Sequence, residues 1–403
     1  MTSPDEQLSA PPIWFLALCA ASSVVGLTIL TPMLPLMMQD LRVSSNAVQS
    51  LLTFYLVAIA VGQIIAGPMS DRWGRRPVMI VGTILYAIGS LVCALNSNIE
   101  ILKAGRIVQG LGAAACMAMS RAIVNDVFKR SEAARQMSTI AMVLAVAPAL
   151  SMAFAGLIVE TVRWQGTMAL LALLGIVMCV CAWSVARETN RHRLPRFDLL
   201  ALVLSYAAVL GNTRFLCWAL CSGMQVGVFF VLNGVLAYQY QRHGYSMAQF
   251  GLWFSLTPLF YIIGNSLNRS WFVARGLERA ALIGTMLSLV SMVSIFTTQW
   301  AGLTHALSLA LPCCLFGFSN GIVVANSTVG AISASSDHIG TASGIVGALQ
   351  MATGGIAGAI IVALGGTDEF SIASLAMIVM CLISVVCMLM IFAIETNRRR
   401  QQL

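Results

Sequence analysis

The chain has 403 residues and a net charge of +8, with 59% hydrophobic and 9% charged residues and a mean hydropathy of +0.86. These values lie far outside the range of soluble globular proteins, so a soluble enzyme or binding domain is excluded. The 23 basic residues are spread along the chain, which argues against a nucleic-acid partner. We predict an all-α protein that crosses a lipid bilayer many times.

The apolar runs, taken in chain order, predict twelve membrane-spanning helices of roughly 20 residues each, the length that crosses about 30 Å of hydrocarbon. Charged or turn-forming residues bound each run. A further run at 198–210 is too short to span, so it predicts a helix at the membrane surface. The predicted spans are 13–36, 48–68, 77–95, 102–123, 136–159, 166–186, 214–236, 247–268, 279–298, 302–328, 339–365 and 370–394.

The basic residues predict the orientation, because Lys and Arg are retained in cytoplasmic loops. Under the twelve-span topology most of them fall on the side that holds both termini, which we therefore expect to be cytoplasmic. A bacterial inner (plasma) membrane location follows for a bacterial source. The residues on this side are Arg72, Arg75, Arg76, Lys129, Arg130, Arg135, Arg187, Arg191, Arg193, Arg196, Arg269, Arg275, Arg279, Arg398, Arg399 and Arg400.

A strongly polar stretch at 187–196 divides the chain, with about six predicted spans on either side. We therefore predict an N-terminal six-helix bundle over 1–186, a cytoplasmic linker with an interfacial helix over 187–212, and a C-terminal six-helix bundle over 213–403. Bundles related as parallel repeats place a substrate site at their interface near the bilayer midplane, where access alternates by rocking.

Residues 67–77, with the sequence GPMSDRWGRRP, place four charges and two helix breakers between two apolar runs. This pattern predicts a tight basic turn between two helices. It also resembles the loop signature of the major facilitator superfamily of secondary transporters, in which Gly is followed by Asp-Arg and then by Gly-Arg-Arg. The resemblance implies the major facilitator fold and a transport function.

Three further segments resemble that superfamily. The sequence RIVQGLGAA at 106–114 is similar to the Arg-x-x-Gln-Gly motif of drug-transporting members, and SRAIVND at 120–126 is similar to a stretch of the Bcr/CflA drug:proton antiporters. The region from Gly321 through GTASG at 340–344 to Gln350 is similar to the same subfamily.

The resemblance implies that the segment at 67–77 forms a conformational latch. Asp71 would face the positive N-terminal end of the helix near Gly340 and Thr341, while Arg75 or Arg76 would pair with Asp126. These contacts would hold the cytoplasmic side closed while the outer side is open. The latch residues are Gly67, Asp71, Arg72, Gly74, Arg75, Arg76 and Asp126.

The sequence also departs from the subfamily's pattern. The first span usually carries an Asp before a Pro-x-x-Pro pair, and here Thr28 stands in that place. The glycine-rich antiporter signature of the fifth span is reduced to a run in which Pro148 is kept, where we predict a helix kink. No predicted span core contains Asp or Glu, so the route of any coupled proton is open.

Arg106 is the one clearly intramembrane charge. One possibility is that it lines the substrate cavity, where it would tune a proton-carrying group or pair with an anionic substrate. The other is that it donates hydrogen bonds to backbone carbonyls and to Gln63 or Gln109. Polar span residues are further candidates for the cavity wall, because the membrane offers them no water. Asn265 and Asn320 belong to this wider group. The predicted cavity residues are Arg106, Gln109, Thr28, Thr31, Gln63, Asn233, Asn326 and Gln350.

We predict a secondary transporter that works by alternating access and exports drugs or other small molecules in exchange for protons. The alternative is a carrier of an organic anion such as a carboxylate metabolite or siderophore. An enzyme is disfavoured because no span holds paired carboxylates or a zinc motif, and the Cys residues lack metal-ligand spacing. We expect no cofactor and no metal, a monomer, and as partners a small-molecule substrate, protons and the lipid bilayer.

Overall fold

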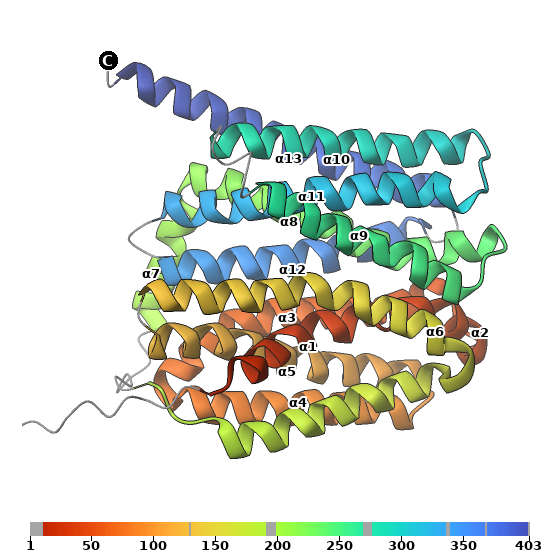
Figure 1. Cartoon of the computed structure of the whole chain (residues 1–403), viewed down its shortest axis with the longest axis horizontal. Coiled ribbons are helices and arrows are strands. Elements are labelled where there is room, and N and C mark those ends of the chain that lie inside the picture. Colours follow the sequence, from red (N-terminus) through yellow and green to blue (C-terminus); the bar gives the residue numbers. More distant parts are fainter. Residues whose placement is uncertain are drawn as a thin grey trace, which may run out of the picture.

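The computed structural model describes residues 11–128, 130–190, 199–268, 276–335, 339–366 and 369–401. These residues form long α-helices and one short 3-10 helix, and most helices run side by side along one direction (Figure 1). The expected all-α class is therefore confirmed. Of the basic residues used to predict the orientation, Lys129, Arg191, Arg193, Arg196, Arg269 and Arg275 lie outside the described residues.

The N-terminal half comprises the elements up to residue 185. Its first helix is interrupted near two prolines, Pro32 and Pro35, each of which stands in the first turn of the segment that follows. The elements are α1 (Ile13–Thr28), η1 (Thr31–Met33), α2 (Leu34–Leu41), α3 (Ser45–Trp73), α4 (Arg75–Leu95), α5 (Ile99–Val127) and α6 (Arg130–Val185).

The C-terminal half follows α7, a separate 12-residue apolar helix at Leu199–Leu210, where a surface helix was predicted. Asn212 caps the next helix by accepting hydrogen bonds from two backbone N–H groups of its first turn. The elements are α8 (Thr213–Arg242), α9 (Met247–Leu267), α10 (Leu277–Trp300), α11 (Ala306–Ala334), α12 (Ile339–Ala363) and α13 (Phe370–Gln401).

Eleven helices among the described residues are long and apolar enough to cross a membrane. The remaining predicted span, 136–159, falls in the first part of α6, where Met142–Ile158 forms a shorter apolar helix. The break in α6 lies at Arg163, whose φ of 54° and ψ of 171° are not helical. The protein is thus a multi-pass membrane protein, and a kink at Pro148 itself stays a prediction.

The turn predicted at 67–77 is wrong in its length, because the turn in the structure is much shorter. Helix α3 continues through Asp71 and Arg72 to Trp73, and α4 begins at Arg75, so the turn is reduced to Gly74. Gly74 has a φ of 102°, a conformation that residues with a Cβ rarely adopt, which explains why a single glycine suffices to reverse the chain. Pro68 is accommodated inside α3.

Within each half every helix packs against several others, but the two halves meet mainly along two seams. One seam joins α6 to α9 and the other joins α3 to α12, with smaller contacts from η1 and α2 to α8 and α9. The helices between the seams enclose the space where the candidate site lies.

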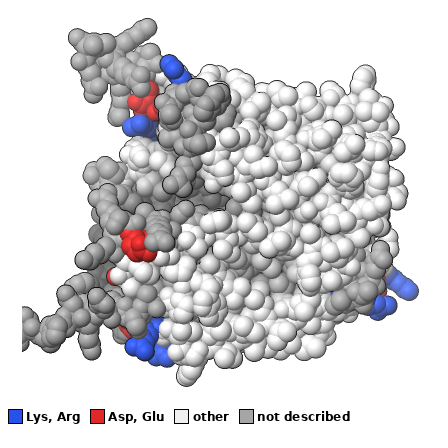
Figure 2. All heavy atoms as spheres, viewed as in Figure 1, with Lys and Arg blue, Asp and Glu red and all other residues white. Residues whose placement is uncertain are grey.

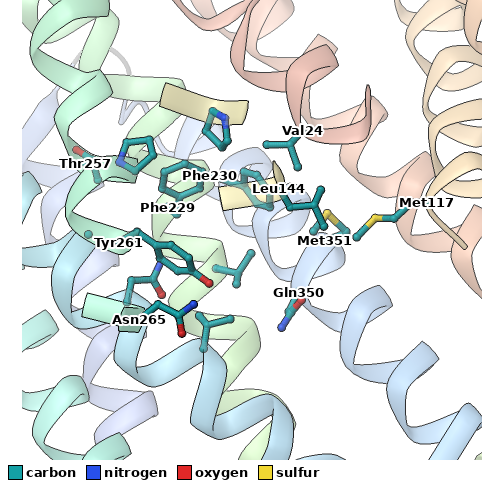
Figure 3. Close-up of a pocket in the computed structure, with 16 residues that line it drawn as sticks. Val24, Met117, Leu144, Phe229, Phe230, Thr257, Tyr261, Asn265, Gln350 and Met351 are labelled. Carbon is teal, nitrogen blue, oxygen red and sulfur yellow. The ribbon is translucent and has the colours of Figure 1, made fainter. Parts of the chain in front are cut away.

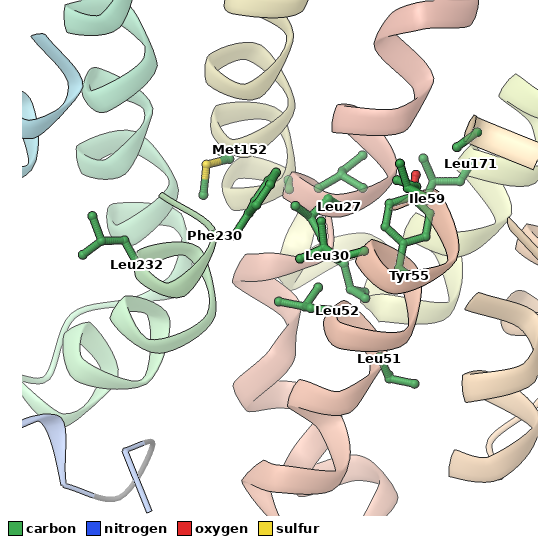
Figure 4. Packing of buried hydrophobic residues seen from close by; sticks show 14 of the residues in the cluster. Leu27, Leu30, Leu51, Leu52, Tyr55, Ile59, Met152, Leu171, Phe230 and Leu232 are labelled. Carbon is green, nitrogen blue, oxygen red and sulfur yellow. The ribbon is translucent and has the colours of Figure 1, made fainter. Parts of the chain in front are cut away.

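The halves are closely packed at the end of the molecule opposite α7. On the α6–α9 seam, a Cβ added to Gly156 would lie 3.0 Å from Gly251 Cα, so the two backbones approach as closely as glycine allows. Beside this crossing, Phe230 of α8 belongs to the same buried cluster as Met152 of α6 and Leu30 (Figure 4). This end of the space between the halves is therefore closed.

Charged side chains lie at the two ends of the helices, and the visible face between the ends carries none (Figure 2). Large apolar side chains such as Leu157, Trp183 and Val180 are more than 60% exposed. An uncharged belt of exposed apolar side chains is the surface that a lipid bilayer covers.

Candidate functional site

A cavity of about 260 Å³, which we call the central cavity, lies between the two halves (Figure 3). Helices α1, α5 and α6 contribute one part of its wall, and α8, α9, α11 and α12 contribute the rest. The lining residues are Val24, Met117, Leu144, Pro148, Val226, Phe229, Phe230, Thr257, Pro258, Tyr261, Asn265, Gly317, Asn320, Val324, Gln350 and Met351.

The wall is mainly apolar and aromatic, and none of these residues is charged. Three polar side chains, Thr257, Tyr261 and Asn265, follow at intervals of four along α9, so they lie on one face of that helix. Gln350 of α12 donates to Ser222 Oγ at 2.7 Å. The central cavity can therefore enclose a small molecule and offer it hydrogen bonds.

A second cavity, of about 400 Å³, lies toward α7 and is more polar. Met117 lines both cavities, so the two adjoin each other at its side chain. Residues of α3, α4, α5, α7 and α12 form its wall: Gln63, Ile64, Gly67, Pro68, Ser70, Asp71, Arg75, Met117, Ala118, Met119, Arg121, Ala122, Asn125, Tyr206, Thr341, Ser343 and Gly344. We call it the outlet cavity.

Charged groups at the edge of the outlet cavity form a compact cluster around Arg75. Its Nη1 lies 2.6 Å from Asp71 Oδ1, and its Nε lies 2.9 Å from Asp126 Oδ2. Thr189 Oγ1 donates to the same Asp126 oxygen at 3.0 Å, and Glu188 accepts from the backbone N–H of Arg75 at 2.9 Å. The segment that follows α6 is thus tied to the α3–α4 turn.

The predicted latch residues are brought together only in part. Asp71, Arg75 and Asp126 meet, and Asp71 and Gly67 share the outlet cavity with Thr341 of the first turn of α12. Arg76 instead donates to the backbone carbonyl of Trp183 at 3.2 Å, and Arg72 is exposed.

Removing the cation of this cluster should impair transport. We expect Arg75→Ala to insert normally but to reduce the transport rate roughly tenfold, if the lost charge-assisted bonds contribute about 1.4 kcal/mol to holding Asp71 in place. Transport into proteoliposomes, normalised to the amount of inserted protein, measures this effect. Lys103→Ala, which removes the ion-pair partner of the exposed Glu100, is the matched control. Equal rates for both variants and the parent protein would contradict a latch role.

Arg106 does not line the central cavity. It is fully buried among α1, α3 and α5, where Nη1 donates to Gly26 O at 2.8 Å and to Gln109 Oε1 at 2.6 Å. Its guanidinium carbon lies 3.9 Å from the centre of the Tyr55 ring, and Nε donates to Leu51 O at 3.3 Å. The expectation of a cavity-lining cation is thus replaced by the alternative, in which Arg106 bonds backbone carbonyls and Gln109.

The other predicted cavity residues are also mostly elsewhere. Gln109 is buried and donates to Ser90 Oγ, and Thr28 Oγ1 lies 2.6 Å from Ser151 Oγ between α1 and α6. Asn326 exchanges two amide hydrogen bonds with Asn268, and Thr31 and Asn233 are buried away from the cavity. Gln63 lines the outlet cavity, so Gln350 and Pro148 remain as predicted residues that line the central one.

A sequence model described as the Major Facilitator Superfamily matches residues 16–359. The chain belongs to this superfamily. As a major facilitator protein it is a transporter and not an enzyme. The arginine buried in α5 and the charge cluster at the α3–α4 turn belong to two of the sequence motifs that resemble this superfamily.

Curated relatives of this major facilitator protein are drug-resistance proteins. Multidrug resistance protein D of Escherichia coli is 29% identical over 93% of this chain and 94% of the relative. The chloramphenicol resistance protein of Pseudomonas aeruginosa is 29% identical over 82% and 78%, and the bicyclomycin resistance protein homolog of Haemophilus influenzae is 27% identical over 79% and 80%.

Solved structures share its fold at low sequence identity. The POT family transporter PepTSo matches with a TM-score of 0.75 and 12% identity over 99% of both chains. A D-xylose-proton symporter matches with a TM-score of 0.72 and 14% identity, over 92% of this chain and 96% of the other. At these identities the likeness shows the fold alone.

The residues that sequence reasoning missed are those of the α9 face and the aromatic wall. Thr257, Tyr261 and Phe229 were not singled out, although polar groups at intervals of four in an apolar helix are a recognisable signal. The sequence predicts Asn265 and Asn320 only as members of the wider group of polar span residues, and both line the central cavity.

Proposed function

We propose that the chain is a secondary active exporter of drugs or similar small molecules, driven by proton antiport with alternating access. The observation that carries this proposal is the central cavity, which is apolar and aromatic, lies between the two halves and is closed at one end. The names of the curated relatives, which are drug-resistance proteins, support the choice of substrate.

We further propose twelve spans in two six-helix bundles, with 1–186 and 213–403 as the bundles and 187–212 as the linker. The first part of α6 would supply the twelfth span. The packing supports this division, because the halves meet mainly along the α6–α9 and α3–α12 seams. Two bodies joined along two seams can rock about a site between them.

We propose that the protein is a monomer in the bacterial inner membrane and that both termini lie in the cytoplasm. The outlet cavity then faces the cytoplasm and the α6–α9 crossing faces outward, so the structure corresponds to an inward-facing state. The basic residues near the α3–α4 turn, Arg72, Arg75 and Arg76, agree with this orientation.

For the coupled proton we propose the charge cluster of the outlet cavity. Among the described residues that line the two cavities, Asp71 is the single carboxylate, and it shares Arg75 with Asp126. A proton on either acid would remove one ion pair with Arg75 and thereby loosen the cluster. The position before the first proline pair cannot take this role, since Thr28 does not titrate.

An organic-anion carrier has less support than the sequence suggested, because Arg106 lies outside the central cavity and bonds backbone carbonyls. The one experiment that separates the two functions uses everted membrane vesicles with an acid interior, monitored by a quenched fluorescent weak base. We expect drugs to restore the fluorescence in vesicles that contain the protein and not in vesicles that lack it. Failure of every drug, together with accumulation or loss of an added carboxylate, would replace the exporter by the anion carrier.

A further inference from the structure

Arg121 is a cationic side chain in the wall of the outlet cavity that has no partner within the described protein. It belongs to the last part of α5 and is partly buried. Its nitrogen atoms make no hydrogen bond or ion pair with any residue that the structure describes, and they keep accessible surface in the cavity. Other arginines at this end of the molecule are paired, Arg75 with Asp126 at 2.9 Å and Arg214 with Glu395 at 2.7 Å.

The side chain of Arg121 is directed into the space between the halves. Met117, Arg121 and Asn125 follow at intervals of four along α5, so they lie on one face of that helix, and all three line the outlet cavity. An arginine that only anchors a helix at the membrane surface would extend along the lipid-facing side toward the headgroups. Anchoring therefore does not account for the position of Arg121.

Other hydrogen-bond donors line the same cavity. The hydroxyl of Tyr206 on α7 makes no hydrogen bond to a residue within the described ranges, and it also keeps accessible surface. Thr341 belongs to the first turn of α12, where backbone N–H groups carry a partial positive charge. Asp71, the carboxylate in this wall, is held by Arg75 at 2.6 Å and does not neutralise Arg121.

Arg121 needs a counter-charge when the outlet cavity closes. A carrier with alternating access must close this end in the other half of its cycle, and the water in the cavity then leaves. A cation that is buried without a counter-charge is strongly destabilising. An anion bound in the open state would supply that charge.

We propose that the outlet cavity is an anion-binding site, in which the guanidinium of Arg121 holds a phosphate group and Tyr206 and the first turn of α12 donate further hydrogen bonds. A forked guanidinium matches two phosphate oxygens, and the remaining oxygens can accept from the opposite wall. The volume of about 400 Å³ lies within the range of roughly 300–1,000 Å³ that is usual for ligand pockets.

The phosphate group would belong to a free anion or to the headgroup of a lipid, because both present the same chemistry to Arg121. The site is separate from the central cavity and adds to the proposed drug export. Its occupancy can be measured whether or not drugs are exported.

The first experiment measures the Tm of the purified full-length protein in a neutral detergent while inorganic phosphate replaces sodium chloride at constant ionic strength. We expect the Tm of the parent protein to rise and then to level off, because a ligand of the folded state stabilises it by mass action. Arg121→Gln should raise the half-saturating phosphate concentration at least about tenfold, since it removes a charge-assisted fork. Lys103→Gln, which removes a cation from the first part of α5, is the matched control and should respond like the parent.

The ligand-free proteins separate binding from a structural role. Without phosphate, Arg121→Gln should have the Tm of the parent or a higher one, because no hydrogen bond to a described residue is lost. A lowered Tm together with an unchanged phosphate response would overturn the site. Should Arg121→Gln fail to insert, Arg121→Lys, which keeps the charge but not the fork, should respond to phosphate more weakly than the parent.

The second experiment identifies the source of the phosphate group. The protein is reconstituted in nanodiscs of dioleoylphosphatidylglycerol or dioleoylphosphatidylcholine, and native mass spectrometry counts the lipids that stay bound. A phosphatidylglycerol molecule kept by the parent and by Lys103→Gln, but not by Arg121→Gln, would assign a lipid headgroup. A phosphate response that depends on Arg121, without such a lipid, would assign a free anion. An equal rise of the Tm in the parent and Arg121→Gln would be a general salt effect, and with no Arg121-dependent lipid it would refute anion binding here.

Discussion

Arg106→Ala should destabilise the N-terminal half by about 3–5 kcal/mol and reduce transport by more than tenfold. Helix α1 ends at Thr28, and the backbone N–H of Leu30 bonds Leu27 O, so Arg106 supplies the hydrogen bond that Gly26 O receives at the helix end. The same side chain bonds Leu51 O and Gln109 and covers Tyr55. Alanine would leave these acceptors buried without their donor.

The measurement is the Tm of the purified protein in detergent, together with transport per inserted molecule. Arg106→Lys keeps the charge but not the forked geometry, so it should recover little of the lost stability. Lys103→Ala, about one turn earlier in α5, should match the parent protein. A stable Arg106→Ala protein that has lost transport alone would contradict this structural role and return Arg106 to direct contact with substrate or proton.

Gly156→Leu should hold the end of the molecule opposite α7 open and abolish transport. Any Cβ at this position meets Gly251 Cα at 3.0 Å and the carbonyl oxygens of Met247 and Ala248 at 3.2 Å, so a leucine side chain cannot fit while α6 and α9 cross here. We expect at least a tenfold loss of transport, because a carrier that cannot close one end cannot complete an alternating cycle.

Hydrogen–deuterium exchange provides the readout for this variant. Peptides from 148–158 and 247–256 should take up deuterium faster in Gly156→Leu than in the parent, while those of α4 and α10 should not change. Phe154→Leu, a substitution on the exposed side of α6, is the control. Normal exchange and normal transport in Gly156→Leu would show that this crossing need not close.

Composition and apolar runs predicted the fold class and most of the helices, because the hydrocarbon core imposes length and polarity on every span. The family resemblance at 67–77 implied that Arg75 or Arg76 would pair with Asp126, and it is Arg75 that does. It did not predict that α3 continues to Trp73, since Pro68 is tolerated inside a membrane helix. The sequence could place these residues because Asp71 is close to Arg75 in the chain, and because Arg75 and Asp126 carry opposite charges.

The cavity wall was far less predictable. Arg106, Thr28 and Asn326 are polar span residues that the membrane forces inward, and all three are used to join helices within one half. Asn320 and Asn265 have the same chemistry, yet they line the cavity. The difference is set by the rotation of each helix against its neighbours, which no single segment encodes.

Met117 separates the two cavities along the path of a transported molecule. It is the residue common to the central and outlet cavities, and its sulfur accepts only long hydrogen bonds, from Ser23 Oγ at 3.6 Å and Gln63 Nε2 at 3.4 Å. Met117 is buried, and its unbranched thioether can adapt to a neighbour more readily than a branched side chain can. A molecule that passes between the two cavities must displace this side chain, and that movement is distinct from the parting of α6 from α9.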